Sequence, residues 1–264
     1  YAMEAVARQF ATGKKCLVIR NGWFSYRWTQ IFEMGDIPAS STVLKARQIE
    51  EGPQAAVAPA PIEDVVATIR KEQPDVVFAP HVETSSGMML SDAYIRAAAD
   101  AVHDTGGLFV LDCIASGAMW VDMEQCGVDV LVSAPQKGWS GSPCCGLVML
   151  SSRGLEAVPS TQSTSFACDL GKWLEIMQAY EKGGHAYHAT MPTDPLRRFR
   201  DVMKETEEIG FESLRDAQQE LGNRIRALLV ACGIKSVAAE GFQAPGVVVS
   251  YTDDPEVKSG KKFL

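Results

Sequence analysis

Short apolar runs that alternate with helix-like segments constrain the fold of this chain more than any other feature of its sequence. The runs are rich in β-branched residues and contain few polar residues, which is typical of strands buried on both faces of a sheet. We expect strands at residues 15–20, 41–46, 76–79, 108–113, 128–134 and 146–151. Helices between such strands are typical of parallel sheets. The sequence therefore predicts an α/β fold with a mostly parallel central sheet.

The segments between and after these strands have the spacing of amphipathic helices. Pro61 opens one of them, because proline is favoured at the first helical position, and Val65 and Ile69 then share one face. The other expected helices cover residues 23–34, 91–104, 169–182, 193–209 and 211–232. A last strand is expected at residues 244–251, where "APGVVVSY" is apolar.

The character of the chain changes near residue 160, where a polar, loop-like stretch begins. We expect a large domain over residues 1–190 and the start of a smaller α+β domain over residues 191–264. The chain opens within a helix-like segment and ends abruptly at Leu264. We therefore expect that the N-terminal part of the large domain is missing and that the smaller domain is truncated.

Composition and charge argue against several classes of partner. The 264 residues carry a formal net charge of −8, and no basic stripe is present, which argues against nucleic acid as a partner. No apolar run approaches the ~18 residues that a membrane-spanning helix needs, so we expect no membrane association. Seven cysteines without the spacing of a disulfide framework suit a reducing compartment, and we expect a cytoplasmic protein.

Two groups of residues have the chemistry of metal ligands but not the pattern. Cys144 and Cys145 are adjacent, with no matching CxxC motif or histidine pair. His185 and His188 have no evident third ligand. No metal site is therefore expected.

Polar residues follow several of the expected strands, at the point where each strand ends. They are Asn21, His81, the stretch from Glu83 to Ser86, Asp112, Gln136 and Lys137. The carboxyl ends of parallel strands meet at one edge of the sheet, and ligands usually bind there. The sequence therefore predicts a binding site at this edge.

Asp112 and Lys137 have the most specific chemistry of this group. Asp112 follows the buried run "LFVL", and a carboxylate there needs a cationic or hydrogen-bonding partner because unpaired burial is costly. A pyridinium nitrogen is one such partner, and a lysine near a carbonyl cofactor can form a Schiff base. A strand-end aspartate followed by a loop lysine is the arrangement that pyridoxal phosphate enzymes require. The pair therefore predicts pyridoxal 5'-phosphate as the cofactor.

Three separated motifs extend this pattern: "HVETSSGMML", "FVLDCIASGAMWVDMEQCGVDVLVSAPQKGW" and "AYHATMP". Together, and in this order, they resemble class V aminotransferases, in particular the alanine/serine–glyoxylate branch of the fold type I pyridoxal phosphate enzymes. The resemblance runs from residue 1 to about residue 230. It implies the three-layer, mostly parallel sheet of those transferases, with a smaller C-terminal α+β domain.

The resemblance implies a role for each matching residue around the cofactor ring. Lys137 resembles the Schiff-base lysine, and Gln136 before it resembles a residue that contacts the cofactor phosphate. Asp112 resembles the partner of the pyridinium nitrogen, and Ile114 resembles a residue that packs beneath the ring. Phe24, in "NGWFSYR", matches an aromatic residue that stacks on the ring. From the residues alone, an ordinary core position for Phe24 stays open.

Further matches concern the cofactor and the neighbouring subunit. Thr84 resembles a hydroxyl residue that contacts the cofactor. Tyr187 and Thr190, in "YHATMP", match residues that reach the phosphate from the neighbouring subunit, which implies a homodimer with shared active sites. For His81, a structural hydrogen-bonding role and a place in the pocket both stay open.

Some features of the family fall outside this chain. The glycine-rich phosphate loop normally precedes "AMEA", whereas this chain starts at Tyr1, and the arginine that binds the substrate carboxylate lies past Leu264. After the lysine, the chain reads "SPCCG" where relatives often read Pro-Pro-Gly. The identities of the amino donor and the acceptor therefore stay open.

The resemblance implies an enzyme, a pyridoxal phosphate-dependent aminotransferase. It would move an amino group from a small serine-like or alanine-like amino acid to a small oxo acid, glyoxylate or pyruvate, through a Schiff base on Lys137. Two alternatives stay open: a lyase or desulfurase of the same fold, and a non-catalytic fragment. A desulfurase needs a mobile cysteine, and the cysteines here lie in expected strands, in helices or beside the lysine loop.

Overall fold

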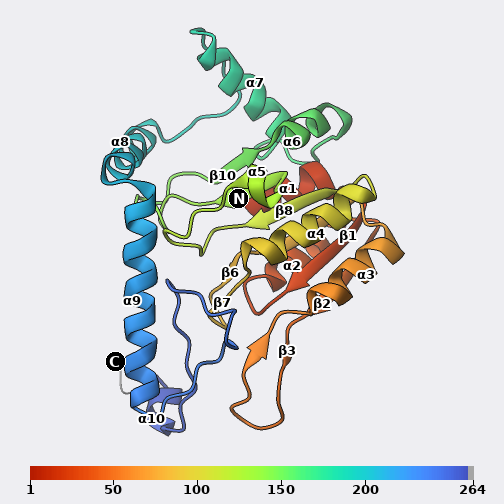
Figure 1. Ribbon diagram of the computed structural model, residues 1–264. Helices are drawn as coiled ribbons and strands as arrows, with labels where there is room; N and C mark the ends of the chain where they lie inside the picture. The colour runs from red at the N-terminus through yellow and green to blue at the C-terminus, as the bar shows by residue number, and fades with distance from the viewer. Residues whose placement is uncertain (261–264) are drawn as a thin grey trace.

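The computed structural model describes residues 1–260 and has three layers, a central sheet with helices on both faces (Figure 1). The strand order in the six-stranded sheet is β10-β9-β8-β5-β1-β2. These strands are β1 (Lys15–Arg20), β2 (Ser40–Lys45), β5 (Val76–Pro80), β8 (Leu108–Asp112), β9 (Val130–Ser133) and β10 (Leu147–Leu150). All neighbouring pairs are parallel except β9 with β10. The predicted α/β fold with a mostly parallel sheet is confirmed.

Two small antiparallel pairs lie outside this sheet. One joins β3 (Arg47–Gln48) to β4 (Val57–Ala58), and Figure 1 shows it as a hairpin that projects from the sheet. The other joins β6 (Val82–Glu83) to β7 (Met88–Met89), directly after β5.

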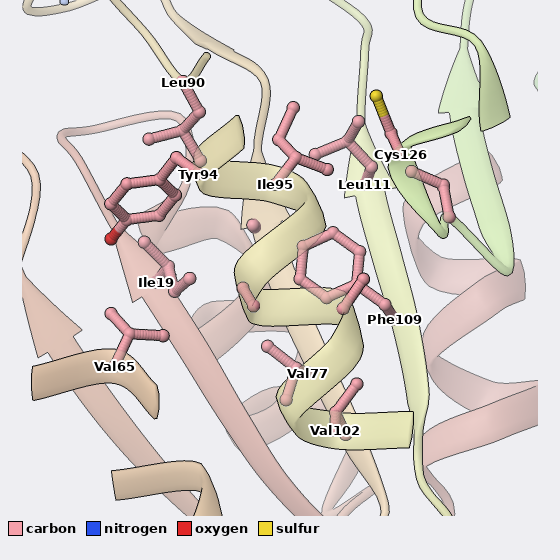
Figure 2. Packing of buried hydrophobic residues seen from close by; sticks show 14 of the residues in the cluster. Ile19, Val65, Val77, Leu90, Tyr94, Ile95, Val102, Phe109, Leu111 and Cys126 are labelled. Carbon is pink, nitrogen blue, oxygen red and sulfur yellow. The ribbon is translucent and has the colours of Figure 1, made fainter. Parts of the chain in front are cut away.

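One face of the sheet is covered by α3 (Ile62–Glu72), α4 (Asp92–Asp104) and α5 (Met123–Cys126). Ser91 caps α4 by accepting a hydrogen bond from Tyr94 N at 3.2 Å. Figure 2 shows the packing of α4 against the sheet, where Ile95 and Val102 meet apolar side chains such as Phe109. These side chains are fully buried, so they form the larger part of the core.

The opposite face is covered by α1 (Ala2–Val6), a π-helical turn η1 (Ala7–Ala11) and α2 (Tyr26–Gly35). Three aromatic rings join α2 to β5 here. The centroid of Trp28 lies 4.6 Å from that of Phe78, and the centroid of Phe32 lies 5.2 Å from it. Burial on both faces explains why the strands read as nearly continuous apolar runs.

The second half of the chain is mostly helical. Its elements are α6 (Ser152–Ala157), the 3-10 turn η2 (Val158–Ser160), α7 (Leu170–Glu181), α8 (Thr193–Ile209), α9 (Phe211–Ala231) and α10 (Pro255–Lys258). Figure 1 shows α9 standing beside the edge at which the parallel strands end. None of the described helices combines the length and the apolar character that crossing a bilayer requires. The division into domains at residue 190 stays a prediction.

The strand expected at residues 244–251 is wrong. Within that stretch only Ser250 makes a β-bridge, an isolated one with Ser236. The backbone pairs with residues 235–237 through Val237 N to Val249 O at 3.0 Å and Tyr251 N to Lys235 O at 2.9 Å, and Arg226 of α9 donates to Ala244 O and Val247 O. These contacts do not make a continuous ladder, so the stretch is not a strand.

The predicted helices are confirmed, with shifted ends at two of them. The helix expected from residue 23 begins at Tyr26, because residues 22–25 form a turn. Pro61 is the N-cap of α3 rather than its first helical residue.

The carboxylate of Asp129 is buried at the edge of the sheet where β8 and β9 begin, and it connects β8 to α4. It accepts from Phe109 N at 2.8 Å and lies 2.7 Å from Nε2 of His103 on α4. We expect Asp129→Ala to lower the free energy of unfolding by about 3 kcal/mol, because a buried N–H and the histidine lose their partner. Urea unfolding measures this.

A matched control for this variant is Arg47→Ala. Arg47 is paired with Asp64, and both side chains are more than half exposed. The control should change the free energy of unfolding by less than about 1 kcal/mol. Equal changes in the free energy of unfolding for the two variants would show that the contacts of Asp129 do not stabilise the fold.

Candidate active site

A cavity of about 450 Å³ lies at the carboxyl ends of β8 and β9, and Lys137 forms part of its wall. Thr84, which follows β6, lies in the same wall. Further walls come from Ala115, Gly117 and Ala118 after β8, from Leu214 and Gln218 of α9, and from Val247. Segments far apart in sequence therefore meet around the lysine.

Lys137 lies in a tight turn that follows β9. Ser140 N donates to Lys137 O at 3.0 Å and closes the turn. A Cβ on Gly138 would lie 2.1 Å from Gly117 O, so only glycine fits at residue 138. This close approach ties the backbone of the lysine loop to the loop that follows Asp112.

Aromatic rings also pack against the lysine loop, through Trp139. The ring of Trp139 lies 4.9 Å from that of Trp120, and 6.0 Å and 6.1 Å from those of Phe199 on α8 and Phe211 on α9. Trp120 Nε1 donates to Phe211 O at 3.1 Å. The start of α9 is thereby fixed against the loop that carries Lys137.

Asp112 ends β8 and is buried, and its strand partner in β9 is Val132. Its Oδ1 accepts from Ile114 N at 2.9 Å, and within residues 1–260 this is the one hydrogen bond that the carboxylate accepts. Burial raises the pKa of Asp112 to about 6, the negative charge of Glu83 adds to this, and Ile114 N–H and Arg27 oppose it. The carboxylate is therefore poorly compensated, which suits a cationic partner.

The loop after β8 is held by two side chains from elsewhere in the chain. His81 Nδ1 lies 2.8 Å from Ser116 Oγ, and Gln218 of α9 accepts from Ala118 N at 3.0 Å. Burial lowers the pKa of His81 to about 4, and the charge of Arg215 adds to this. His81 is thus a neutral hydrogen-bonding residue at pH 7, and it does not line the cavity.

Phe24 lies in the turn between β1 and α2. Its side chain is 38% exposed, so the structure does not make it a core residue. The guanidinium carbon of Arg27 lies 5.4 Å from its ring centroid. Glu83 binds the backbone of this turn, since Phe24 N donates to Glu83 Oε1 at 3.0 Å.

Of the predicted site residues, Lys137 and Thr84 line the cavity, whereas Asp112, Phe24, Ile114, Gln136, Tyr187 and Thr190 are not among its lining residues. Gln136 is exposed, and Ile114 is half-buried and packs against the apolar cluster beneath α1 and α2. Tyr187 and Thr190 lie in the exposed loop between α7 and α8, with Tyr187 Oη 3.3 Å from Thr190 Oγ1. Within one chain, the structure does not bring Tyr187 and Thr190 to Lys137.

Sequence reasoning missed Gln218 and gave Glu83 no role. Gln218 lies 100 residues after Ala118, whose N–H it binds, and nothing in the local sequence of α9 marks it. Glu83 had a signal, because a glutamate three residues after the end of buried strand β5 needs partners as much as Asp112 does.

The family model described as "Aminotransferase class-V" matches residues 40–248 of this sequence. The match covers most of the chain, including β5, β8, β9 and the lysine loop. The chain belongs to the class-V aminotransferases. The resemblance predicted from the three motifs is confirmed.

Curated relatives in this family include two glyoxylate aminotransferases. The L-aspartate–glyoxylate aminotransferase of Paracoccus denitrificans (strain Pd 1222) is 26% identical over 238 residues, covering 89% of this chain and 56% of the relative. The serine–glyoxylate aminotransferase of Hyphomicrobium methylovorum is 27% identical, with 90% and 56% covered. The chain spans little more than half the length of these relatives.

Solved structures share the fold. An alanine–glyoxylate aminotransferase from Nostoc sp. superimposes with a TM-score of 0.82 at 20% identity, covering 98% of this chain and 65% of that one. The three-layer fold of the fold type I transferases, which the resemblance implied, is thereby confirmed.

Proposed function

We propose that this chain forms the cofactor-binding part of a pyridoxal phosphate-dependent aminotransferase. The observation that carries the proposal is the position of Lys137 in a cavity between the loop after Asp112 and α9. Membership of the class-V aminotransferases supports it.

Three residues at this edge of the sheet fit pyridoxal 5'-phosphate: Lys137 and Thr84 line the cavity, and Asp112 ends the strand whose following loop lines it. Asp112 is a buried carboxylate with a single backbone donor and no salt bridge within the described residues, so a cationic ring nitrogen would satisfy it. Lys137 supplies the one amine among the residues that line the cavity. Thr84 adds a hydroxyl to the same wall.

Pyridoxal phosphate, when bound, supplies an aldehyde that condenses with amines and a protonated ring that accepts an electron pair from the substrate. Asp112 would keep the ring nitrogen protonated, and Phe24 and Ile114 would pack on the ring. Nζ of Lys137 would hold the aldehyde and, once released, take the proton from Cα of the amino donor. Gln136 and Thr84 would contact the cofactor.

The substrates we propose are a small amino acid, serine-like or alanine-like, and a small oxo acid, glyoxylate or pyruvate. The relatives named above act on glyoxylate, which supports the acceptor.

We also propose a homodimer with shared active sites. Tyr187 is 78% exposed and lies away from the cavity of its own chain, as expected for a residue that serves a neighbouring subunit. Thr190 lies in the same loop and is hydrogen-bonded to it.

Steady-state kinetics with pyridoxal phosphate tests the function. A panel of amino donors is combined with glyoxylate or pyruvate, and we expect parallel double-reciprocal lines, because two half-reactions share one site. Turnover should require both substrates. Repeated turnover of an amino acid without an oxo acid would instead establish a lyase or desulfurase. Protein that takes up no cofactor would establish a non-catalytic fragment.

A further inference from the structure

Glu83 is a fully buried carboxylate next to the candidate active site, and within the described residues it has no salt bridge. An isolated buried charge is costly unless hydrogen bonds replace the lost water. The hydrogen-bond donors around Glu83 therefore indicate its role.

Glu83 accepts five hydrogen bonds, and all come from two short segments. Its Oε1 accepts from Phe24 N at 3.0 Å, Ser85 N at 3.1 Å and Ser85 Oγ at 2.7 Å. Its Oε2 accepts from Ser25 N at 2.8 Å and Ser25 Oγ at 2.7 Å. The segment 24–25 directly precedes α2, so the carboxylate also lies at the positive end of that helix.

The turn and the glutamate are in close contact. A Cβ on Gly22 would lie 2.8 Å from Glu83 Cγ and 2.2 Å from Ser85 Oγ. Ser85 Oγ also accepts from Trp23 N at 2.8 Å. The backbone of residues 22–25 therefore packs directly against the Glu83 side chain.

The side chain of Phe24 has little else to fix it. It is partly exposed, and the ring contact that accompanies it is the exposed Arg27 at 5.4 Å. The position of the ring thus depends on the backbone of its own turn, and that backbone is bound by Glu83.

We infer that Glu83 is a positioning residue, which holds the turn at residues 22–25 so that Phe24 is preorganised to stack on the cofactor ring. This inference rests on the proposed function. Glu83 is fully buried and both of its carboxylate oxygens are occupied by donors from residues 24–25 and 85, so it acts through the turn that carries Phe24 and not by contact with substrate.

Glu83→Gln is the sharpest variant. Both carboxylate oxygens of Glu83 face N–H and O–H donors, so the amide NH₂ of glutamine must face donors at one of the two positions. Gly22→Ala is a second variant, which displaces the carboxylate without removing it. Asp129→Asn is the matched control, because Asp129 is also a buried carboxylate that accepts a backbone N–H, at the opposite edge of the sheet.

Two measurements separate positioning from general stability. Hydrogen exchange of the Phe24 and Ser25 amides should quicken about tenfold or more in Glu83→Gln and Gly22→Ala, and stay unchanged in the control. The dissociation constant for pyridoxal phosphate, from absorbance titration, should rise about tenfold in both variants and less than about twofold in the control.

A double-mutant cycle with Phe24→Ala tests whether Glu83 affects cofactor binding through Phe24. If Glu83 acts through Phe24, adding Glu83→Gln to Phe24→Ala should change the dissociation constant less than about twofold. Equal cofactor affinity in wild type and Glu83→Gln overturns the inference, and so does full additivity in the cycle. Wild-type protein that binds no pyridoxal phosphate overturns the proposed function, whereas unchanged amide exchange in Glu83→Gln overturns the positioning alone.

Discussion

Lys137→Ala is expected to abolish aminotransferase turnover, with a fall in kcat of about 10⁴-fold or more. Lys137 is the one amine among the described residues that line the cavity, so no neighbour replaces it in holding the aldehyde or in moving the proton. An enzyme-bound pyridoxal phosphate absorbs near ~420 nm, and borohydride should bleach this band in the wild-type protein. The variant should lack the band. Spectra and steady-state kinetics on the same preparations measure both effects.

Lys172→Ala is a suitable control for this variant. Lys172 lies on α7, is paired with Glu175 and is half exposed. Its replacement should leave kcat and the cofactor spectrum unchanged, because an exposed ion pair contributes little. Retention of the ~420 nm band in Lys137→Ala would show that another amine holds the cofactor.

Asp112→Asn is expected to lower kcat by about a hundredfold or more, since a neutral amide no longer stabilises a protonated ring nitrogen. Asparagine keeps the size of the side chain and can still accept the hydrogen bond from Ile114 N. The loss should therefore appear in kcat rather than in folding. Kinetics at saturating pyridoxal phosphate, with the far-UV circular dichroism as a check on folding, measure it.

The same substitution should stabilise the cofactor-free protein. Burial raises the pKa of Asp112 from 3.8 to about 6, so ionisation of the folded state costs free energy that grows between these pH values and is complete above pH 6. Asparagine removes that cost, and the free energy of unfolding at pH 7 should rise by up to about 3 kcal/mol. The gain should shrink to less than about 1 kcal/mol near pH 4, where Asp112 is protonated in the folded state and about half ionised in the unfolded state.

Urea unfolding of both proteins at pH 7 and pH 4, without cofactor, measures this difference. A variant that is less stable than wild type at pH 7 would mean that the carboxylate is well compensated in the folded protein. An unchanged kcat would mean that Asp112 is not the partner of the ring nitrogen.

Much of the fold could be predicted because its signals are local. The strands are buried on both faces, so runs such as residues 76–79 and 108–113 are readable without knowledge of their partners. The positions of Asp112 and Lys137 follow from the same pattern, since each comes after a buried run. Their convergence at one edge is a property of parallel sheets.

What the sequence could not show depends on contacts between distant residues. Gln218 reaches Ala118 from a helix with no local mark of that contact. The segment at residues 244–251 reads as a strand, but its backbone pairing is limited to an isolated bridge, and Arg226 binds the carbonyl groups of Ala244 and Val247. In both cases a side chain competes for backbone groups, and hydrophobic periodicity contains no information on such pairings.

The closure of the cavity by α9 has a consequence for biosynthesis. All six strands of the sheet are complete at Leu150, whereas Gln218 and Leu214 belong to a helix that ends at Ala231. A chain that emerges from the ribosome can therefore form its sheet well before the wall of the cavity exists. The pyridoxal phosphate binding proposed above would then follow translation of α9, so a nascent chain stalled before this helix should be unable to load the cofactor.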